Sequence, residues 1–191
     1  MYLTGFDRIP FKTMFSSQHC ALVVIDVQGR LTQTMDNKDQ LLSNIQRLLK
    51  AALLLDIPIV VTEQAPDKIG STISEISQYL KEVPIKKNSF SCCGEKAFLE
   101  KIAGLNTRQI IVCGIETHVC VFQTVCDLKQ HHYDVQVVVD AVSSRSHQNK
   151  QLGLNRIESV GGVLTCGEMI ICELLKTADH PKFRDIMKLI K

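Results

Sequence analysis

Short apolar runs alternate with longer stretches whose apolar residues recur every three or four positions, and this alternation extends along most of the chain. The runs are apolar at nearly every position, as parallel strands covered on both faces are. They predict strands at 20–26, 58–63, 83–87, 109–115, 135–141 and 162–166. The stretches between and after them predict helices at 38–55, 71–80, 95–103, 117–131, 147–160, 167–175 and 181–190.

The stretch at 38–55 has the clearest helical period. Its apolar positions form one face of a helix and are Leu41, Leu42, Ile45, Leu48, Leu49 and Ala52. Repeated strand-then-helix units imply right-handed crossovers and strands that lie parallel. The pattern therefore predicts an α/β fold, a three-layer doubly wound (Rossmann-like) parallel sheet.

Length and composition indicate an ordinary globular protein with one core. The chain has 191 residues, of which 45% are hydrophobic and 22% charged. We find no Gly/Pro/Ser linker, no composition break and no internal repeat, so we expect a single domain over residues 1–191.

Charge and hydropathy exclude several partners. The formal net charge is +2, and no Lys/Arg run exceeds two residues, so we expect no nucleic-acid partner. No apolar run approaches the roughly 20 residues of a membrane span. The N-terminal "MYLTGFDRIPFKTMFSS" lacks the apolar core of a secretory signal. We expect a cytoplasmic protein, with a mitochondrial presequence as the alternative.

The cysteines do not have the spacing of a metal site. None of the eight forms C-x-x-C, and Cys92 and Cys93 are adjacent, so we expect reduced thiols and no metal. The turn "DVQGRL" after the first strand lacks G-x-G-x-x-G, and no phosphate-binding P-loop occurs. We expect no cofactor.

Reactive side chains gather at the predicted strand ends. Ligands bind beyond the carboxyl ends of the strands in an open parallel sheet. The polar and reactive residues there are Asp26, Glu63, Gln64, Lys86, Lys87, Thr117, His118, Cys120, Asp140, Thr165 and Cys166. An acid, an amine and a thiol from distant strands thus converge on one edge.

Cys120 falls in the first turn of the helix after the fourth strand. The helix dipole and a nearby lysine ammonium favour the thiolate there and lower a thiol pKa. Asp26 is placed to carry a proton between sulfur and a leaving group. The alternatives are a packing thiol at Cys120, a turn-capping Asp26 and a solvated surface lysine. Strand alternation does not decide whether Lys86 or Lys87 points inward.

Three segments at these strand ends resemble the isochorismatase-like cysteine hydrolases: "ALVVIDVQ", "KNSFS" and "GIETHVCV". The further segments "TEQAPDKIGST", "VDAVSSR" and "DHPKFRDI" resemble the isochorismatase-domain-containing subgroup. The superfamily pattern covers about residues 20–175, and a terminal helix is expected at about 180–190.

The resemblance implies a six-stranded sheet and a catalytic triad of Asp26, Lys87 and Cys120. Lys87 is selected over Lys86 because the family lysine stands three residues before an aromatic-Ser pair, here Phe90-Ser91.

The resemblance also implies a cis peptide bond between Ile115 and Glu116 and an oxyanion hole built from the Glu116 and Cys120 amides. The candidate substrate contacts at the same edge are Gln28, Gln64, Phe90, Thr117 and His118.

Three functions follow as hypotheses. The first is a metal-independent cysteine hydrolase that opens an amide- or carbamoyl-like C–N bond of a small molecule. Metal-dependent nicotinamidases of the superfamily carry histidines in the loop after the second strand. The corresponding segment here, "TEQAPDKIGST", has none. The second is a vinyl-ether hydrolase of isochorismatase type with Asp26 as general acid. The third is a non-catalytic binding or assembly protein on the same fold. The resemblance further implies a homo-oligomer.

Overall fold

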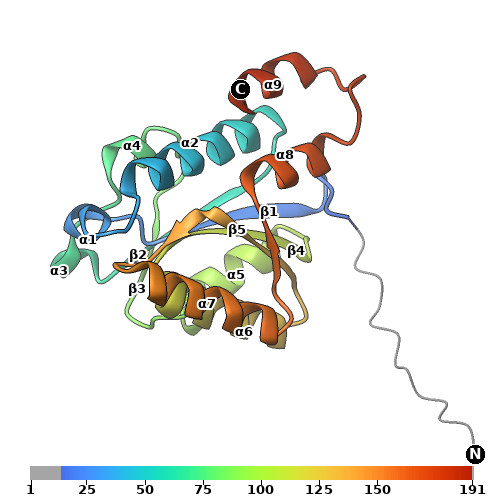
Figure 1. Ribbon diagram of the computed structural model, residues 1–191. Coiled ribbons are helices and arrows are strands. Elements are labelled where there is room, and N and C mark those ends of the chain that lie inside the picture. The colour runs from blue at the N-terminus through green and yellow to red at the C-terminus, as the bar shows by residue number, and fades with distance from the viewer. Residues whose placement is uncertain (1–13, 191) are drawn as a thin grey trace, which may run out of the picture.

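A computed structural model describes residues 14–190; residues 1–13, on which most of the targeting prediction rests, and Lys191 lie outside the described residues. Its centre is a six-stranded sheet with the order β3-β2-β1-β4-β5-β6 (Figure 1). The strands are β1 (Cys20–Ile25), β2 (Ile59–Gln64), β3 (Ile85–Lys87), β4 (Gln109–Ile115), β5 (Asp134–Ser143) and β6 (Val163–Thr165). Every neighbouring pair is parallel, so the predicted doubly wound sheet is confirmed.

Helices cover both faces of the sheet. They are α1 (Gly29–Gln33), α2 (Lys38–Leu54), α3 (Pro66–Ile69), α4 (Ser74–Ser77), α5 (Lys96–Gly104), α6 (Phe122–Gln130), α7 (His147–Ser159), α8 (Gly167–Leu175) and α9 (Phe183–Ile190), with the short turns η1 (Cys92–Gly94) and η2 (Thr117–Val121). Figure 1 shows α2, α8 and α9 on one face and α5, α6 and α7 on the other. The layers therefore follow the three-layer prediction.

The apolar strands explain this arrangement. Leu22 and Val24 of β1 pack into the core under α2 and α8, whereas Ala21, Val23 and Ile25 pack into the core under α5 and α6. Each is at most 2% exposed. Full burial of one aliphatic side chain of this size stabilises the fold by about 1.5–3 kcal/mol. A strand that is apolar on both faces is thus stable only between two helical layers.

The predicted helix at 71–80 is wrong at both ends, because α4 covers only Ser74–Ser77. Residues 71–73 are held in an extended conformation beside the end of β1, because Gly29 N–H donates to the Ser71 carbonyl at 3.1 Å and Ile73 N–H donates to the Val27 carbonyl at 3.1 Å. Helix α4 therefore begins only at Ser74.

The predicted helix at 117–131 is also different. Its first five residues form the wider π-helical turn η2 before α6 begins at Phe122. Short π-helical turns of this kind occur frequently at functional sites.

Two further expectations concern the limits of the chain. Among residues 14–190, no helix has both the length and the apolar character needed to cross a bilayer. The assignment of all 191 residues to one domain stays a prediction.

Candidate active site

Asp26 follows β1 directly and has a left-handed backbone, with φ 54°. For a non-glycine residue this region costs of the order of 1–3 kcal/mol, and residues held in it are enriched at functional sites. The side chain is fully buried, and Thr62 Oγ1 donates to Asp26 Oδ1 at 2.8 Å. The Asp26 N–H donates to the Thr62 carbonyl at 3.2 Å. The carboxylate is therefore held at the carboxyl edge of the sheet by β2.

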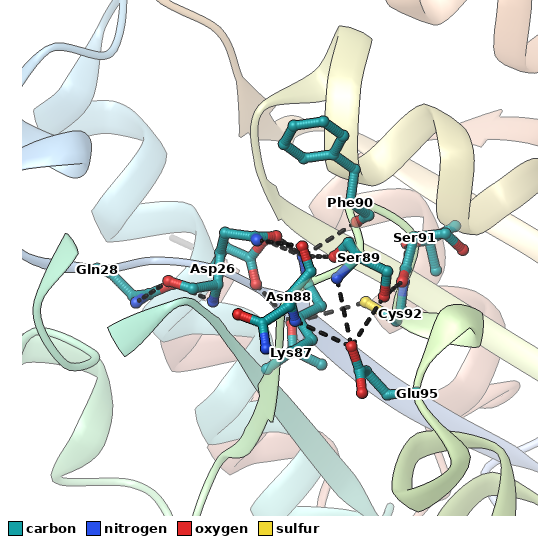
Figure 2. A network of polar contacts seen from close by, with 12 residues as sticks. Asp26, Gln28, Lys87, Asn88, Ser89, Phe90, Ser91, Cys92 and Glu95 are labelled. Carbon is teal, nitrogen blue, oxygen red and sulfur yellow. Dashed lines mark hydrogen bonds and ion pairs between the residues drawn. The ribbon is translucent and has the colours of Figure 1, made fainter. Parts of the chain in front are cut away.

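Lys87 lies at the end of β3 and is 2% exposed, whereas Lys86 is exposed, so the structure resolves the choice between them. Lys87 Nζ lies 2.7 Å from Asp26 Oδ2. It also donates to Gln64 Oε1 at 2.6 Å, to the Phe90 carbonyl at 3.0 Å and to the Ser89 carbonyl at 3.2 Å. Figure 2 shows the chain from 87 to 91 folded around this ammonium. A buried cation is stable here because its N–H groups meet acceptors.

Glu95 holds the loop that follows Lys87. Its Oε1 accepts hydrogen bonds from Asn88 N at 2.9 Å, from Ser89 N at 3.3 Å and from Ser89 Oγ at 3.0 Å (Figure 2). These donors, the backbone N–H of Asn88 first, lower the pKa of Glu95 below its ordinary value. The carboxylate thereby fixes the two carbonyl groups that accept from Lys87.

Cys120 lies in η2 and is 7% exposed. Burial first, and then the negative charge of Asp26, raise the pKa of its thiol to about 12, although the Lys87 ammonium acts in the opposite direction. A hydrogen bond with the Asp26 side chain contributes in the same direction as burial. The sequence-based expectation of a lowered thiol pKa is therefore wrong, because burial and the adjacent carboxylate outweigh the lysine.

This arrangement makes the thiol and the carboxylate a donor-acceptor pair. At neutral pH the sulfur keeps its proton and shares it with Asp26. The Asp26 carboxylate is therefore the acceptor that lies next to the thiol proton.

Two glycines allow the backbones around η2 to come close. Gly114 has φ 116°, and a Cβ there would overlap the Ile25 carbonyl beside Asp26. A Cβ on Gly153 of α7 would lie 2.8 Å from the His118 nitrogen. Neither position has room for a side chain, which fixes η2 between β1 and α7.

The peptide bond between Ile115 and Glu116 is cis, at the position that the family resemblance implies. The Glu116 carboxylate is 9% exposed and accepts from Arg145 N at 2.9 Å and from Arg145 Nε at 3.2 Å. The start of η2 is thereby attached to the loop after β5.

The structure gives Gln28 and Gln64 structural contacts. Gln28 is fully buried; its amide donates to the Gln64 carbonyl at 3.1 Å and the Gly70 carbonyl at 2.5 Å, and its Oε1 accepts from Gln64 N at 2.7 Å. Gln64 in turn accepts from Lys87 and donates to the Asn88 carbonyl at 2.8 Å. Their amides are engaged by the protein, so the contacts favour positioning over the predicted substrate contact.

The other candidate substrate contacts differ in exposure. The Phe90 side chain is 55% exposed and in Figure 2 points away from the polar network. His118 is half-buried, with Nδ1 3.0 Å from Ser144 Oγ. Thr117 is fully buried, and its hydroxyl finds no hydrogen-bond partner within the described part of the chain. Phe90 is thus the most exposed of the five candidates, His118 and Gln64 are half-buried, and Gln28 and Thr117 are buried.

Two buried residues of this network were not singled out from the sequence, Thr62 and Cys92. The Cys92 thiol donates to Thr62 Oγ1 at 3.6 Å, and Thr62 donates to Asp26. A polar residue inside the apolar run of β2 is the signal that could have identified Thr62.

Two cavities of the protein lie away from Asp26, Lys87 and Cys120, and no metal site accompanies these residues in the described part of the chain. One cavity of about 440 Å³ lies between the start of α2, the end of β5 and α7, and one of about 270 Å³ lies beside β3 and the end of α2. None of Asp26, Lys87 and Cys120 lines either of them. In the range 14–190 no three His, Cys, Asp or Glu side chains are grouped as a metal site requires.

Comparison with known proteins identifies the family of the chain. The family profile described as Isochorismatase domain matches residues 20–169. The chain is 38% identical to the Secreted isochorismatase effector Isc1 of Phytophthora sojae, over 89% of this chain and 83% of that protein. It is 37% identical to Isochorismatase domain-containing protein 2A of Mus musculus, over 89% of this chain and 82% of that protein.

A solved structure, that of the MAR1 Ribonuclease from Caenorhabditis elegans, superimposes with a TM-score of 0.88 at 37% identity, covering 93% of this chain and 92% of that one. The family resemblance and the predicted fold are both confirmed. The chain belongs to the isochorismatase-like hydrolase family.

Proposed function

We propose that this protein is a metal-independent cysteine hydrolase that opens an amide- or carbamoyl-like C–N bond of a small molecule. The observation that carries the proposal is the sharing of one buried carboxylate, that of Asp26, by the Lys87 ammonium at 2.7 Å and the Cys120 thiol. Nucleophile, proton acceptor and countercharge are the parts that thiol-based acyl transfer requires.

The first half of the reaction forms a thioester. Asp26 accepts the proton of Cys120 while sulfur forms a bond to the substrate carbonyl carbon. The oxygen that becomes negative accepts from the amides of Glu116 and Cys120, as the family resemblance implies. The C–N bond then breaks, and Asp26 returns the proton to the departing nitrogen. The Lys87 ammonium pairs with the Asp26 carboxylate whenever that carboxylate is ionised.

The second half releases the product. Asp26, again unprotonated, takes a proton from a water molecule whose oxygen bonds to the thioester carbon. The C–S bond breaks, sulfur recovers the proton, and a carboxylic or carbamic acid leaves. Each cycle therefore consumes one water and returns Asp26 and Cys120 to their starting states.

A second candidate is vinyl-ether hydrolysis with Asp26 as general acid and no covalent step. One observation favours it: burial and Asp26 raise the pKa of the Cys120 thiol to about 12, so that sulfur is neutral at rest. Asp26 chemistry alone needs no thiolate. This candidate predicts that Cys120→Ala keeps substantial activity and that Asp26→Asn does not.

The name of the C. elegans relative raises RNA cleavage as a competing activity. We expect none here, because the formal net charge is +2 and no Lys/Arg run exceeds two residues. We expect instead a small-molecule substrate and, as the family resemblance implies, self-association.

The test is intact-protein mass spectrometry after rapid mixing with a panel of small amides and carbamoyl compounds. We expect a substrate-derived thioester on the wild type and none on Cys120→Ala, with Asp26→Asn and Lys87→Met slow to form it. A thioester that persists in Cys120→Ala contradicts the proposal. Isochorismate and a labelled RNA are tested in parallel, because turnover of either by Cys120→Ala assigns the function to the vinyl-ether or the nuclease alternative. Ligand binding with no turnover indicates a binding protein.

A further inference from the structure

Beneath the Asp26 carboxylate lies a chain of uncharged donors that the proposed reaction does not use. Cys92 Sγ donates to Thr62 Oγ1 at 3.6 Å, and Thr62 Oγ1 donates to Asp26 Oδ1 at 2.8 Å. All three residues are fully buried. They come from η1, β2 and the end of β1, so three separate segments meet on one carboxylate oxygen.

The direction of this chain is fixed by its chemistry. A threonine hydroxyl has one proton, and Thr62 gives it to Asp26. Its oxygen is therefore free to accept the thiol proton of Cys92. Cys92 is itself anchored, because its backbone N–H donates to Thr124 Oγ1 of α6 at 3.0 Å. The Thr62 hydroxyl that donates to Asp26 is therefore held in this orientation by the anchored Cys92 thiol.

The two oxygens of Asp26 consequently have different partners. Oδ1 accepts from Thr62, and Oδ2 faces the Lys87 ammonium at 2.7 Å. Rotation of the carboxylate about its Cβ–Cγ bond would break both contacts. A carboxylate has about four acceptor sites, so the two contacts leave capacity for the Cys120 proton in one fixed orientation.

We propose that Thr62, supported by Cys92, is a positioning residue that orients the Asp26 carboxylate and sets the pH above which it accepts the Cys120 proton. The inference rests on the proposed function, since it presupposes that Asp26 takes this proton. A donor to the ionised carboxylate stabilises that form, so Thr62 keeps Asp26 available as a base at lower pH.

The titratable groups that face Asp26 are Lys87 from β3, Cys92 from η1 and Cys120 from η2. Burial raises the pKa of Cys92 to about 11 and that of Cys120 to about 12, so both thiols are neutral in the pH range of interest. Lys87 supplies the one charge among these neighbours. Thr62 can be changed without changing any charge, which isolates its hydrogen bond.

The experiment measures the rate of Cys120 alkylation by iodoacetamide against pH, resolved by peptide mass spectrometry, so that no substrate is needed. We expect the wild-type alkylation rate to fall as the pH is lowered, because Asp26 becomes protonated. This decrease at acid pH, the acid limb, should disappear in Asp26→Asn. Thr62→Val keeps the volume and loses the donor, and we expect it to move the midpoint of that limb upward by about one to two pH units. Thr62→Ser restores the donor and should restore the midpoint.

Thr124→Val is the matched control, because it loses a buried threonine hydroxyl that contacts Cys92 but not Asp26. Because Thr124 reaches Asp26 only through Cys92 and Thr62, we expect Thr124→Val to move the midpoint less than Thr62→Val does. Thr62→Ala repeats the test in case Thr62→Val does not fold, and thermal unfolding of each variant is recorded alongside. Midpoints of Thr62→Val or Thr62→Ala equal to wild type overturn the proposal. An acid limb that survives in Asp26→Asn overturns the role of Asp26 as base, and the role of Thr62 falls with it.

Discussion

The Lys87 ammonium lies 2.7 Å from Asp26 Oδ2, with side-chain exposures of 0% and 1%. A buried ion pair of this kind contributes little net stability, but removal of one partner leaves an unpaired charge in the interior. We therefore expect Lys87→Met to lower the free energy of unfolding by roughly 3–5 kcal/mol, measured by urea denaturation at neutral pH. The double variant Asp26→Asn with Lys87→Met should recover much of that loss. A Lys87→Met protein as stable as wild type would contradict the buried pair.

Gly153 tests how closely α7 packs against η2. A Cβ at this position would lie 2.8 Å from the His118 nitrogen and 2.9 Å from the Thr117 carbonyl carbon, both backbone atoms. We expect Gly153→Ala to displace η2, destabilise the fold by roughly 1–3 kcal/mol and change the alkylation rate of Cys120. Gly104→Ala is the matched control in α5, because nothing lies within 4 Å of its added Cβ. That change should be neutral or stabilise by up to about 1 kcal/mol. Equal effects of the two variants on Cys120 would refute the close-packing account.

Glu95 tests the loop that presents the acceptors of Lys87. Glu95→Ala removes hydrogen bonds to Asn88 N, Ser89 N and Ser89 Oγ, and we expect a loss of about 1–2 kcal/mol in unfolding free energy. Glu100→Ala serves as the control, because its pair with Lys96, at 3.4 Å, is largely exposed and contributes at most about 0.5 kcal/mol. These hydrogen bonds lower the pKa of Glu95, so its contribution is present above its ordinary pKa and is lost as the pH falls through the lowered value. The difference between the two variants should accordingly shrink in acid, which urea denaturation at two pH values will measure.

The sheet could be predicted from the sequence because each strand is an apolar run between periodic helices. The strand at 109–115 and the helix at 167–175 agree with β4 and α8 at both ends. Their signals are local: an apolar segment of strand length, and a helical segment directly after the sixth strand. The candidate residues Asp26 and Cys120 could be placed near strand ends for a similar reason, whereas Lys87 was chosen over Lys86 only from the family resemblance.

What failed depends on contacts between segments distant in sequence. Residues 71–73 are extended because they pair with residues 27–29 after β1, and the local sequence does not reveal this long-range contact. The thiol pKa was predicted in the wrong direction because a helix terminus is visible in the sequence, whereas the burial of Cys120 beside Asp26 is not. Thr62 was missed for the same reason, since its importance comes from the register that sets it against Ile25 of β1.

The stability of the fold should depend on pH in the alkaline range, because burial raises the pKa of several thiols. The pKa of Cys20 and Cys93 rises to about 12, that of Cys92 to about 11, and that of Cys113 also rises. An unfolded thiol titrates near pH 8.5. Because the folded pKa is the higher one, the stability from each protonated thiol is complete below pH 8.5 and is lost as the pH rises towards the folded value.

We therefore expect the free energy of unfolding to fall between about pH 9 and pH 11, by about 1.4 kcal/mol per pH unit for each thiol that stays protonated. Tyrosines and lysines titrate in the same range, so the informative quantity is the difference between variants. Cys113→Ala removes one fully buried thiol and should reduce the slope by about 1.4 kcal/mol per pH unit, whatever its effect on absolute stability. Cys172→Ala, at an exposed position of α8, should reduce it less. Urea denaturation at half-unit intervals of pH measures both slopes, and identical slopes in wild type and Cys113→Ala would mean that this buried thiol ionises as readily in the folded protein as in the unfolded chain.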